Sequence, residues 1–392
     1  MMAGEAQKVG LFQPVTAGLL AAIVGFGSSF PIVLQGLAAA GASPAEAASG
    51  LIALSIVMGL LAIFLSLRTR MPVSVAWSTP GAALLVATGT PEGGFSGAVG
   101  AFLVAAALIV VAGVWKGFGR AVAAIPSSLA NAMLAGVLLD LCLAPVRAVG
   151  AMPALALPII LVWAIAWRFA RLYAVPIAVV VTAAIVLGAT PVPPGALDNI
   201  LPHPVLVLPT LSMDALIGIS LPLFLVTMAS QNVPGLAVMH ANGYRPDVSP
   251  IFVSSGLASM VTSLFGGHLV NLAAITAALC AGPEAHPNPN RRYIAAVTNG
   301  VGYLLLGLFA GFAAAFIAAS PPLLIQAVAG LALLGALTSA LSGALAKESE
   351  RIPAIMTFVT TASGISFFGI GAAFWGLLVG GLMLSLARSG RR

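Results

Sequence analysis

The chain has 392 residues, of which 60% are hydrophobic and only 7% are charged. A water-soluble domain needs roughly a quarter of its residues charged, so this composition excludes a soluble protein. The net charge of +6 does not indicate a nucleic-acid partner, because the basic residues stand one or two at a time between apolar runs. The composition predicts an integral membrane protein, whose surroundings are the lipid bilayer.

Fourteen apolar segments follow one another along the chain, and short polar or Gly/Pro-rich connections separate them. A helix crosses the bilayer in about 20 apolar residues, and we expect all fourteen segments to cross. The first seven lie near 11–40, 44–67, 73–89, 94–115, 122–143, 150–169 and 172–190. The second seven lie near 211–241, 247–265, 267–281, 290–319, 321–346, 352–369 and 371–389. The predicted fold class is an all-α polytopic membrane protein with fourteen transmembrane segments.

The positions of the basic residues test this count. With a cytoplasmic N-terminus and fourteen crossings, every lysine and arginine except Arg147 falls in a connection on the inner side. Removing one span would invert every later connection and destroy this segregation, so the positive-inside rule favours this parity. We expect a multi-pass protein of the inner membrane with both termini in the cytoplasm.

The third and tenth segments, 73–89 and 267–281, are short for a membrane-spanning helix. Each begins with a β-favouring piece, Val73–Trp77 and His268–Val270, and continues with small, helix-compatible residues. Extended backbone at membrane depth is tolerated only where protein or a cavity surrounds it. We therefore expect a short strand followed by a half-helix in both segments, the arrangement that points to a transporter site.

Capping residues predict where these half-helices begin. Pro80 suits the first turn of a helix, with Ser78 or Thr79 as its N-cap. In the tenth segment, Asn271 is placed to cap a helix that begins near Leu272.

The two groups of seven segments correspond to each other. The short segments are third in both groups, Phe30-Pro31 in the first segment matches Val233-Pro234 in the eighth, and residues 41–44 match residues 243–246. Pro126 with Asn131 aligns in the same way with Pro321 and Gln326. Because seven is odd, the second group enters the membrane from the opposite side, which predicts a 7+7 inverted repeat.

This arrangement predicts an anion site between two facing half-helix N-termini. Helix N-termini offer unsatisfied N–H groups and the positive end of a dipole, so no buried lysine or arginine is needed. We expect the backbone of Thr79–Ala82, which includes Gly81, and of Asn271–Ala274 to hold a carboxylate, with Ser78 and Leu272 in the same site. The alternative is that both segments are short, kinked packing helices.

Polar breaks in the first and eighth segments flank this site. They lie at Gly25–Ser29, which includes Ser28, and at Ser230–Asn232, where Gln231 and Asn232 are adjacent. A buried amide in hydrocarbon usually has a partner or a ligand, although helix–helix packing is the alternative for both amides. Trp77 stands before the first half-helix, where either stacking on an aromatic substrate or structural packing would explain it.

Two residues are candidates for carrying a proton. His268 is the only histidine inside a span, and histidine titrates near neutral pH, but a lone histidine is commonly a neutral hydrogen-bonding residue. Asp140 is the one acid well within a span, and an ion pair with Arg147 or an interfacial position competes with a relay role. Cys142 and Cys280 lie in apolar segments and are interpreted as core residues rather than a disulfide or a metal site.

Catalytic motifs are absent from the sequence. It contains no His-Glu-x-x-His pattern, no Gly-x-Ser-x-Gly elbow and no lysine preceded by glycine, which excludes a Walker A loop. We expect no enzymatic activity, cofactor or metal. An intramembrane hydrolase using His268 with Ser28 or Ser78 is disfavoured for the same reason, and uphill transport would need an ion or solute gradient.

Three runs, GFGSSFPIVLQGLAAAG, VAWSTPGAAL and GGHLVNLAAITAAL, resemble the benzoate/proton symporter family over essentially the whole chain. The resemblance implies a core domain made of residues 1–120 (spans 1–4) and 209–319 (spans 8–11). It implies a gate domain made of residues 121–208 (spans 5–7) and 320–392 (spans 12–14). It also implies an elevator-like movement of core against gate, often in a homodimer.

One departure bears on the substrate. Nucleobase permeases of this fold place glutamates on the eighth and tenth spans, where this chain shows Gln231, Asn232 and Asn271. An acid there would repel an anion in a low-dielectric site, so its absence suits benzoate. The proton carrier stays open between His268 and the substrate carboxylate.

These observations give one working hypothesis, the proton-coupled uptake of benzoate or a related aromatic carboxylate. The carboxylate would rest on the helix N-termini with help from Ser28, Thr79, Gln231 and Asn271, and the ring against Trp77. The alternative is a uniporter or channel of the same fold for another small anion.

Overall fold

The computed structural model describes residues 10–115, 117, 126–189, 203–273, 275–367 and 370–389. The first group of elements is α1 (Phe12–Ala39), α2 (Pro44–Thr69), β1 (Val75–Trp77), α3 (Thr79–Thr88), α4 (Gly94–Val114), α6 (Ser127–Ala151), α7 (Pro153–Phe169), η1 (Arg171–Tyr173) and α8 (Ala174–Ala189). The second group begins with α9 (Met213–Ala215), η2 (Leu216–Ser220), α10 (Leu221–Thr227), η3 (Met228–Asn232), α11 (Val233–Ala241), α12 (Val248–Leu264), β2 (Val270–Leu272) and α13 (Ile275–Ala281). It continues with η4 (Pro289–Arg291), α14 (Tyr293–Gly307), α15 (Ala310–Ala319), α16 (Pro322–Leu345), η5 (Glu348–Glu350), α17 (Arg351–Ala362), β3 (Ser366–Phe367), β4 (Ile370–Gly371) and α18 (Ala372–Ser389).

Every one of the predicted apolar segments contains at least one helix of this structure. Within the described ranges, 7 helices are long and apolar enough to cross a membrane, or 8 if α14 and α15, bent by 55° at their junction, form one span. The chain is therefore a mostly helical polytopic membrane protein. The higher number of crossings and the inverted repeat stay predictions.

The expected break in the first segment is wrong, because α1 runs without interruption from Phe12 to Ala39 with Pro31 inside it. The glycines in this helix serve close packing instead. A Cβ atom at Gly25 would collide with the Tyr303 hydroxyl, and one at Gly36 would collide with the Ala82 backbone. Small residues at these positions let neighbouring helices approach, which is their usual role between membrane helices.

The eighth segment departs from α-helical geometry where its polar residues lie. Residues 213–241 form one continuous helical run, in which η2 and η3 are π-helical turns. The predicted break at Ser230–Asn232 falls inside η3, so it is a widening of the helix rather than an interruption. Such π-turns are frequent at functional sites.

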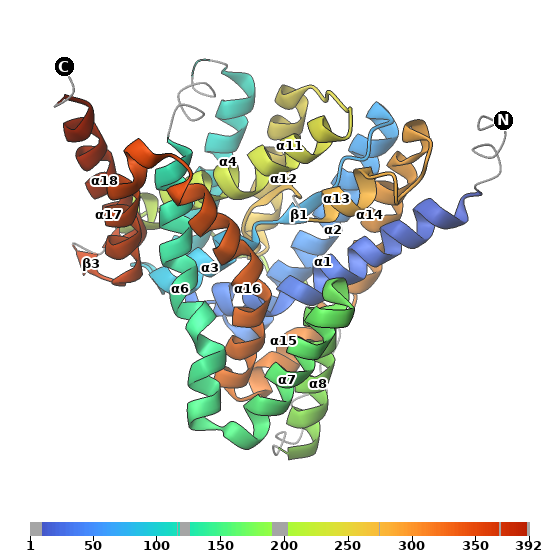
Figure 1. The fold of residues 1–392 in the computed structure, drawn as a ribbon, viewed down its shortest axis with the longest axis horizontal. Coiled ribbons are helices and arrows are strands. Elements are labelled where there is room, and N and C mark those ends of the chain that lie inside the picture. The colour runs from blue at the N-terminus through green and yellow to red at the C-terminus, as the bar shows by residue number, and fades with distance from the viewer. Residues whose placement is uncertain are drawn as a thin grey trace.

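A short antiparallel strand pair joins the third and tenth segments at the centre of the molecule (Figure 1). In β1 and β2, Val75 pairs with Leu272, Ala76 with Asn271 and Trp77 with Val270. Backbone bonds extend the ladder at both ends, from Ser78 N to Leu269 O at 3.0 Å and from Ala273 N to Ser74 O at 3.0 Å. The strand-plus-helix expectation for both segments is confirmed, with shifted boundaries.

The expected cap at Asn271 is wrong. Asn271 lies inside β2, and α13 begins only at Ile275. The reason is the pairing of Ala76 with Asn271 and the bond from Ala273 to Ser74, which keep the backbone extended past Leu272.

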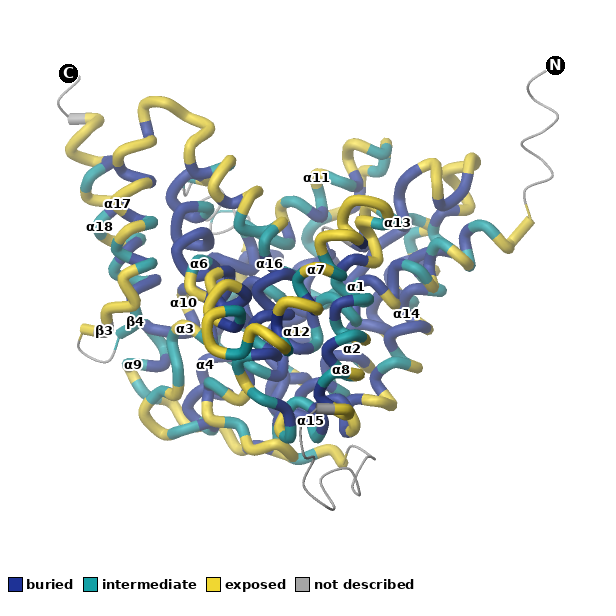
Figure 2. Tube along the Cα trace, turned by 60° about the horizontal axis from the view of Figure 1, so that its bottom comes forward, coloured by how far each residue is buried: buried dark blue, intermediate teal, exposed yellow. Residues whose placement is uncertain are grey.

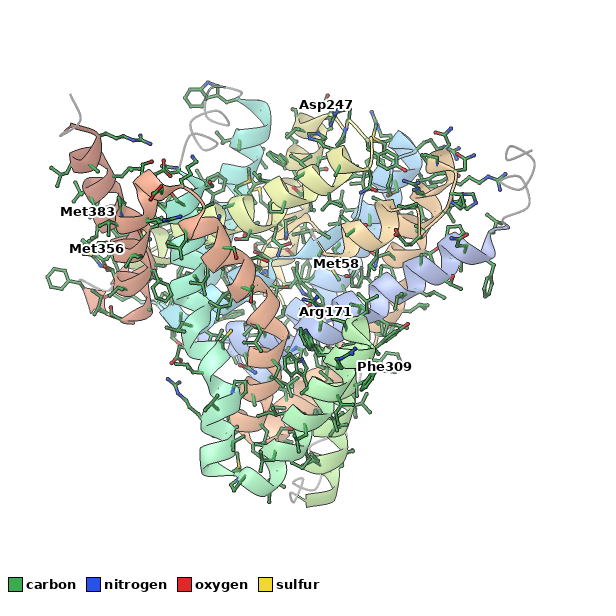
Figure 3. All side chains as sticks on the ribbon, in the orientation of Figure 1. Met58, Arg171, Asp247, Phe309, Met356 and Met383 are labelled. Atoms are coloured by element: carbon green, nitrogen blue, oxygen red, sulfur yellow. The ribbon has the colours of Figure 1, made fainter. Side chains whose placement is uncertain are left out.

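The largest apolar cluster surrounds this strand pair and includes the fully buried side chains of Trp77, Phe102, Phe224 and Tyr303. A second cluster joins the end of α6 with α7, α8, α15 and α16, which lie together at the bottom of Figure 1. Figure 2 shows buried residues concentrated in the middle of the molecule, whereas exposed, intermediate and buried residues alternate along α17 and α18. In Figure 3 the buried Met58 lies near the centre, and Asp247, which caps α12, lies at the upper edge.

Candidate functional site

The two half-helices begin at opposite ends of the strand pair. Ser78 lies opposite Leu269, whereas Ala273 lies opposite Ser74. From Ser74 to Ser78 the ladder is four residues long, roughly 13 Å, and α13 begins at Ile275, two residues beyond Ala273. Figure 1 shows α3 and α13 leaving the strands toward opposite sides. The overlapping antiparallel strands lead into α3 and α13 at opposite ends of the ladder, and the anion site between the two facing N-termini stays a prediction.

The N-terminus of α3 is closed by side chains. Ser78 is its N-cap, and the Ser78 Oγ accepts a hydrogen bond from Gly81 N at 3.2 Å, which confirms the predicted cap. The same Oγ lies 2.7 Å from the Thr227 Oγ1, at the end of α10, and both side chains are fully buried. Gly81 packs so closely against Leu223 that a Cβ would collide with it. Thr79, the first residue of the helix, is half-buried.

The π-helical turn η3 contacts β2, the strand that leads into α13. Asn232 is fully buried, and its Oδ1 accepts a hydrogen bond from Leu272 N at 2.9 Å. Its Nδ2 lies 3.2 Å from the sulfur of Met228. The contact with Met228 lies within η3, and the bond from Leu272 joins η3 to β2, which agrees with the packing interpretation of Asn232. Gln231, its neighbour in η3, is half-buried.

Two fully buried polar side chains, one in β2 and one just before it, have hydrogen-bonding atoms that are not used. Asn271 donates only a long 3.4 Å bond to Leu272 O, and within the described residues its Oδ1 has no partner. The His268 Nδ1 lies 3.2 Å from Leu269 O, while its Nε2 has no partner among the described residues. A ring nitrogen facing a carbonyl must be the N–H donor, so the Nε2 of the neutral ring carries a free lone pair.

Trp77 is held as a packing residue. Its Nε1 donates to the Ser29 Oγ at 2.9 Å, and its ring lies 5.4 Å from that of Phe26 and 6.1 Å from that of Tyr303. Only 2% of Trp77 is exposed. Ser28 is half-buried, and its Oγ makes only a 3.4 Å bond to Gly25 O.

Sequence reasoning included Ser29 in the polar run that flanks the site and missed three residues of this region: Thr227, Thr276 and Tyr303. Ser29 binds Trp77, and Thr227 binds Ser78. Thr276 and Tyr303 meet over Gly25, where a Cβ would contact both. Ser29 stood inside the polar run of α1 and was therefore detectable, whereas the other three lie in ordinary apolar stretches.

Asp140 lies outside this site. Its Oδ1 forms an ion pair with the Arg147 Nη1 at 2.7 Å, and its side chain is 71% exposed. The ion-pair interpretation of Asp140 is thereby confirmed. Cys142 and Cys280 are both buried and unpaired, as expected of core residues. Within the described residues, no three His, Cys, Asp or Glu side chains gather as metal ligands.

The two strands, the helices α3 and α13 that follow them, and the neighbouring α1 and η3 contain no acid, lysine or arginine, and His268 directly precedes β2. The helix α2 also contacts both strands, and its charged residues Glu46 and Arg68 stand in its first and last turns. A low-dielectric region of this kind would repel an anion if it held a carboxylate. Neutral N–H groups and hydroxyls, by contrast, can hold an anion there without a buried cation.

The sequence profile of the benzoate membrane transport protein family matches residues 11–386. The chain belongs to this family. It is 44% identical over 369 residues to the inner membrane protein YdcO of Escherichia coli (strain K12), with 93% of each chain covered. It is 35% identical over 364 residues to the benzoate membrane transport protein of Acinetobacter baylyi, covering 93% of this chain and 92% of that one.

Solved structures share the fold. The transmembrane domain of the cyanobacterial bicarbonate transporter BicA superimposes with a TM-score of 0.56 at 15% identity, covering 96% of this chain and 97% of that one. The structure of SLC26A9 superimposes with a TM-score of 0.64 at 13% identity, covering 99% of this chain and 67% of that one. At such identities the likeness concerns the fold alone. Together these relatives identify this family member as a multi-pass inner-membrane transporter rather than an enzyme.

Proposed function

We propose that this protein takes up benzoate or a related aromatic carboxylate together with a proton. The observation that carries the proposal is the strand pair with a helix following at either end and no charged side chain on the strands or on those two helices. Family membership supports the substrate class, because the Acinetobacter relative is named for benzoate.

The substrate carboxylate would bind at the α13 end of the strand pair. At the α3 end, Ser78 and Thr227 already bond to each other, and the ladder between the two helices is roughly 13 Å long. Toward the α13 end, Asn271 in the middle of β2 and Ser74 opposite Ala273 each have a buried oxygen without a partner among the described residues. The Nε2 of His268 also lacks such a partner, but it lies beside Leu269 at the α3 end. The aromatic ring would lie toward Phe26 and Tyr303, which surround Trp77.

The proposed architecture has fourteen crossings in a 7+7 inverted repeat, with both termini in the cytoplasm. Matching local geometry supports the repeat. Pro126 begins α6 with φ −58° and ψ 122°, and Pro321 begins α16 with φ −57° and ψ 120°. After α1 and α11, Gly41 and Gly243 both adopt positive φ, 102° and 86°. The antiparallel pairing of β1 with β2 is what an inversion would produce.

Movement would be of the elevator type, with the core domain (1–120 and 209–319) sliding against the gate domain (121–208 and 320–392), in a homodimer. The second apolar cluster, which joins α7, α8 and α16, consists of gate residues except for Phe316 and supports the gate as a packed unit. The proton would travel on His268 or on the substrate carboxylate.

The decisive experiment measures labelled benzoate uptake into proteoliposomes with an imposed inward proton gradient. We expect saturable uptake that a protonophore abolishes. Uptake no greater than in empty vesicles would contradict the substrate assignment. Uptake that the protonophore leaves unchanged would contradict the proton coupling.

The bicarbonate transporter and SLC26A9 likenesses favour one rival, a uniporter or channel for a small inorganic anion. Chloride or bicarbonate flux in the same vesicles, without saturation and without a proton gradient, would establish that rival instead.

A further inference from the structure

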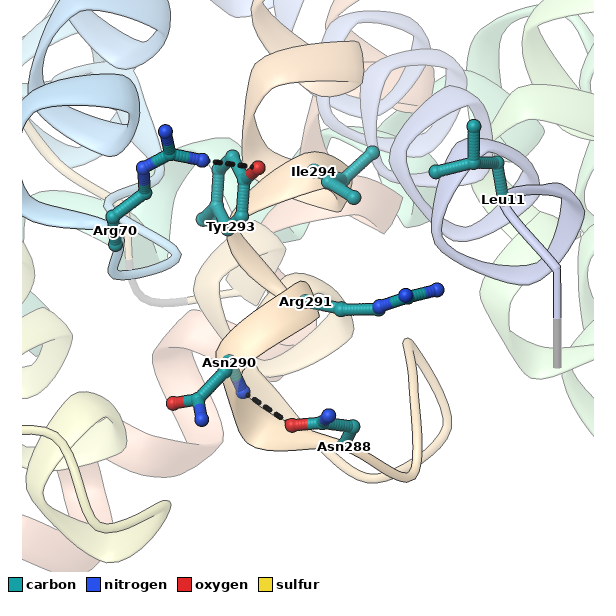
Figure 4. Close-up of a pocket in the computed structure, with 7 residues that line it drawn as sticks. All are labelled: Leu11, Arg70, Asn288, Asn290, Arg291, Tyr293 and Ile294. Carbon is teal, nitrogen blue, oxygen red and sulfur yellow. Dashed lines mark hydrogen bonds between the residues drawn. The ribbon is translucent and has the colours of Figure 1, made fainter. Parts of the chain in front are cut away.

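A pocket opens at the rim of the molecule, where α1 begins, α2 ends and α14 begins (Figure 4). Its volume is about 690 Å³, and its walls carry two arginines, Arg70 and Arg291, together with Tyr293. Leu11 and Ile294 add aliphatic surface, and two asparagines of the loop before α14 complete the lining. This pocket is separate from the strand pair and belongs to no part of the transport site described above.

Arg70 is held at the pocket by an unusual backbone. It follows α2 with φ 56° and ψ 24°, and it is the one non-glycine residue with positive φ in the described ranges. Helices that end in this conformation usually carry glycine, which has no Cβ penalty there. Because glycine would adopt this backbone at lower cost, the arginine at position 70 indicates that its side chain has a function here.

The guanidinium of Arg70 is fixed in place. It lies 4.9 Å from the centre of the Tyr293 ring, and its Nη1 donates to the Tyr293 hydroxyl oxygen at 2.6 Å. A guanidinium has five N–H donors, so most of them stay available. Within the described residues, no carboxylate oxygen lies within 4.0 Å of Arg70 or Arg291. Arg292 differs, because it is buried and bonds to the carbonyls of His286 and Ala281.

Apolar surface continues from this pair of positive charges. Leu11 is 62% exposed and Phe12, beside it at the start of α1, is 81% exposed. A small soluble anion has no apolar part to contact this surface, whereas a phospholipid carries a phosphate and acyl chains in one molecule. Basic pockets between membrane helices on the cytoplasmic side commonly bind anionic head groups.

We propose that this pocket binds the head group of an anionic phospholipid, with Arg70 and Arg291 attracting its negative charge from two sides of the pocket and the acyl chains along Leu11 and Phe12. The site is independent of the proposed transport function.

The test uses the purified full chain in neutral detergent and measures its melting temperature during titration with phosphatidylglycerol. We expect stabilisation of about 2 °C or more, with none from phosphatidylcholine. In the double variant Arg70→Gly with Arg291→Gln, the concentration for half-maximal stabilisation should rise about 25-fold, since each arginine near the membrane contributes about fivefold.

The variant also reports on folding. Because glycine suits the backbone of position 70, the lipid-free melting temperature of the double variant should not fall. Arg68→Gln is the matched control: Arg68 is exposed at the same end of α2, contacts Phe64 and does not line the pocket, so it should keep the lipid response.

Three outcomes would overturn the proposal. Equal stabilisation of the double variant by phosphatidylglycerol would remove these arginines from the lipid response. Stabilisation by inorganic phosphate alone, at the same half-maximal concentration, would assign the pocket to a free anion. Stabilisation by benzoate that the double variant loses would assign it to the substrate.

Discussion

The two ends of the strand pair look alike in sequence but differ in chemistry. At the α3 end, Ser78 caps the helix and shares a 2.7 Å hydrogen bond with Thr227. Toward the α13 end, Asn271 sits in the strand instead of capping, and the Asn271 Oδ1 and the Ser74 Oγ are buried without a partner among the described residues. Buried polar atoms are normally satisfied, so these two oxygens mark the half of the ladder where a ligand is expected. His268, whose Nε2 also lacks a partner there, lies beside Leu269 at the α3 end.

This difference shows that a repeated architecture need not give two equal half-sites. In the proposed function, one helix start holds the fold together and the other is left for the substrate. Substitutions at the two ends of the strand pair test this difference.

Asn271→Asp should have the largest effect. A carboxylate a few ångströms from the bound substrate would cost about 3–4 kcal/mol at an effective dielectric constant near 20, so we expect benzoate affinity to fall at least about a hundredfold. Equilibrium binding of labelled benzoate measures this. Asn242→Asp, in the turn after α11, is the control and should bind normally. Near-normal affinity in Asn271→Asp would remove the α13 end from the site.

Gly25→Ala should be the next most harmful change. The added methyl group would collide with the Tyr303 hydroxyl and the Thr276 methyl group, and such overpacking costs about 1–3 kcal/mol. We expect a lower melting temperature and a rise of about tenfold in the KM for benzoate.

Gly27→Ala is a matched control for that change from the same helix. The nearest atom to its new methyl group would be the Pro176 Cγ at 3.6 Å, an ordinary contact. Transport by Gly27→Ala should stay near wild type. Equal damage from both substitutions would mean that α1 tolerates no methyl group here, whatever it faces.

His268→Gln should change the pH response more than the affinity. The glutamine amide can still donate to Leu269 O but cannot take up a proton as the free Nε2 can. We expect benzoate affinity within about threefold of wild type and uptake that no longer increases as the outside becomes acidic. Initial rates across an external pH series check this, and an unchanged pH profile would move the coupling to the substrate carboxylate.

Thr227→Val should have the smallest effect on function. It removes the hydrogen bond to Ser78 while Ser78 keeps its bond to Gly81, so stability should fall by about 1 kcal/mol. Benzoate affinity should stay within about twofold. Thr338→Val, which removes an exposed hydroxyl bonded only to its own helix, is the control for stability. A large loss of affinity in Thr227→Val would show that the α3 end also binds substrate.

Local signals explain what the sequence could predict. The cap at Ser78 was predictable because a serine before Pro80 specifies a helix start within one turn. The same reasoning failed at Asn271, because pairing with Ala76 in a distant segment overrides a local capping preference. The glycines of α1 predicted a break for a similar reason, since only the folded structure shows Tyr303 and Ala82 lying against them.

The contacts that distinguish the two ends could not be predicted in this way. Ser78 with Thr227, Trp77 with Ser29 and Leu272 with Asn232 each join segments from different parts of the chain. Sequence reasoning placed some of these residues in one region but could not say which polar atoms would satisfy one another.

The pairing of β1 with β2 also constrains how the protein is made. The ladder partner of Ala76 is Asn271, so β1 must wait while the ribosome completes the intervening chain, roughly 10–40 s at ordinary rates of synthesis. During that interval the extended backbone of β1 has no strand partner, and lipid cannot supply one. The segments synthesised earlier must therefore keep the unpaired backbone of β1 away from lipid until β2 has been synthesised. A nascent chain that ends before Val270 should accordingly be degraded faster than one that ends after α13.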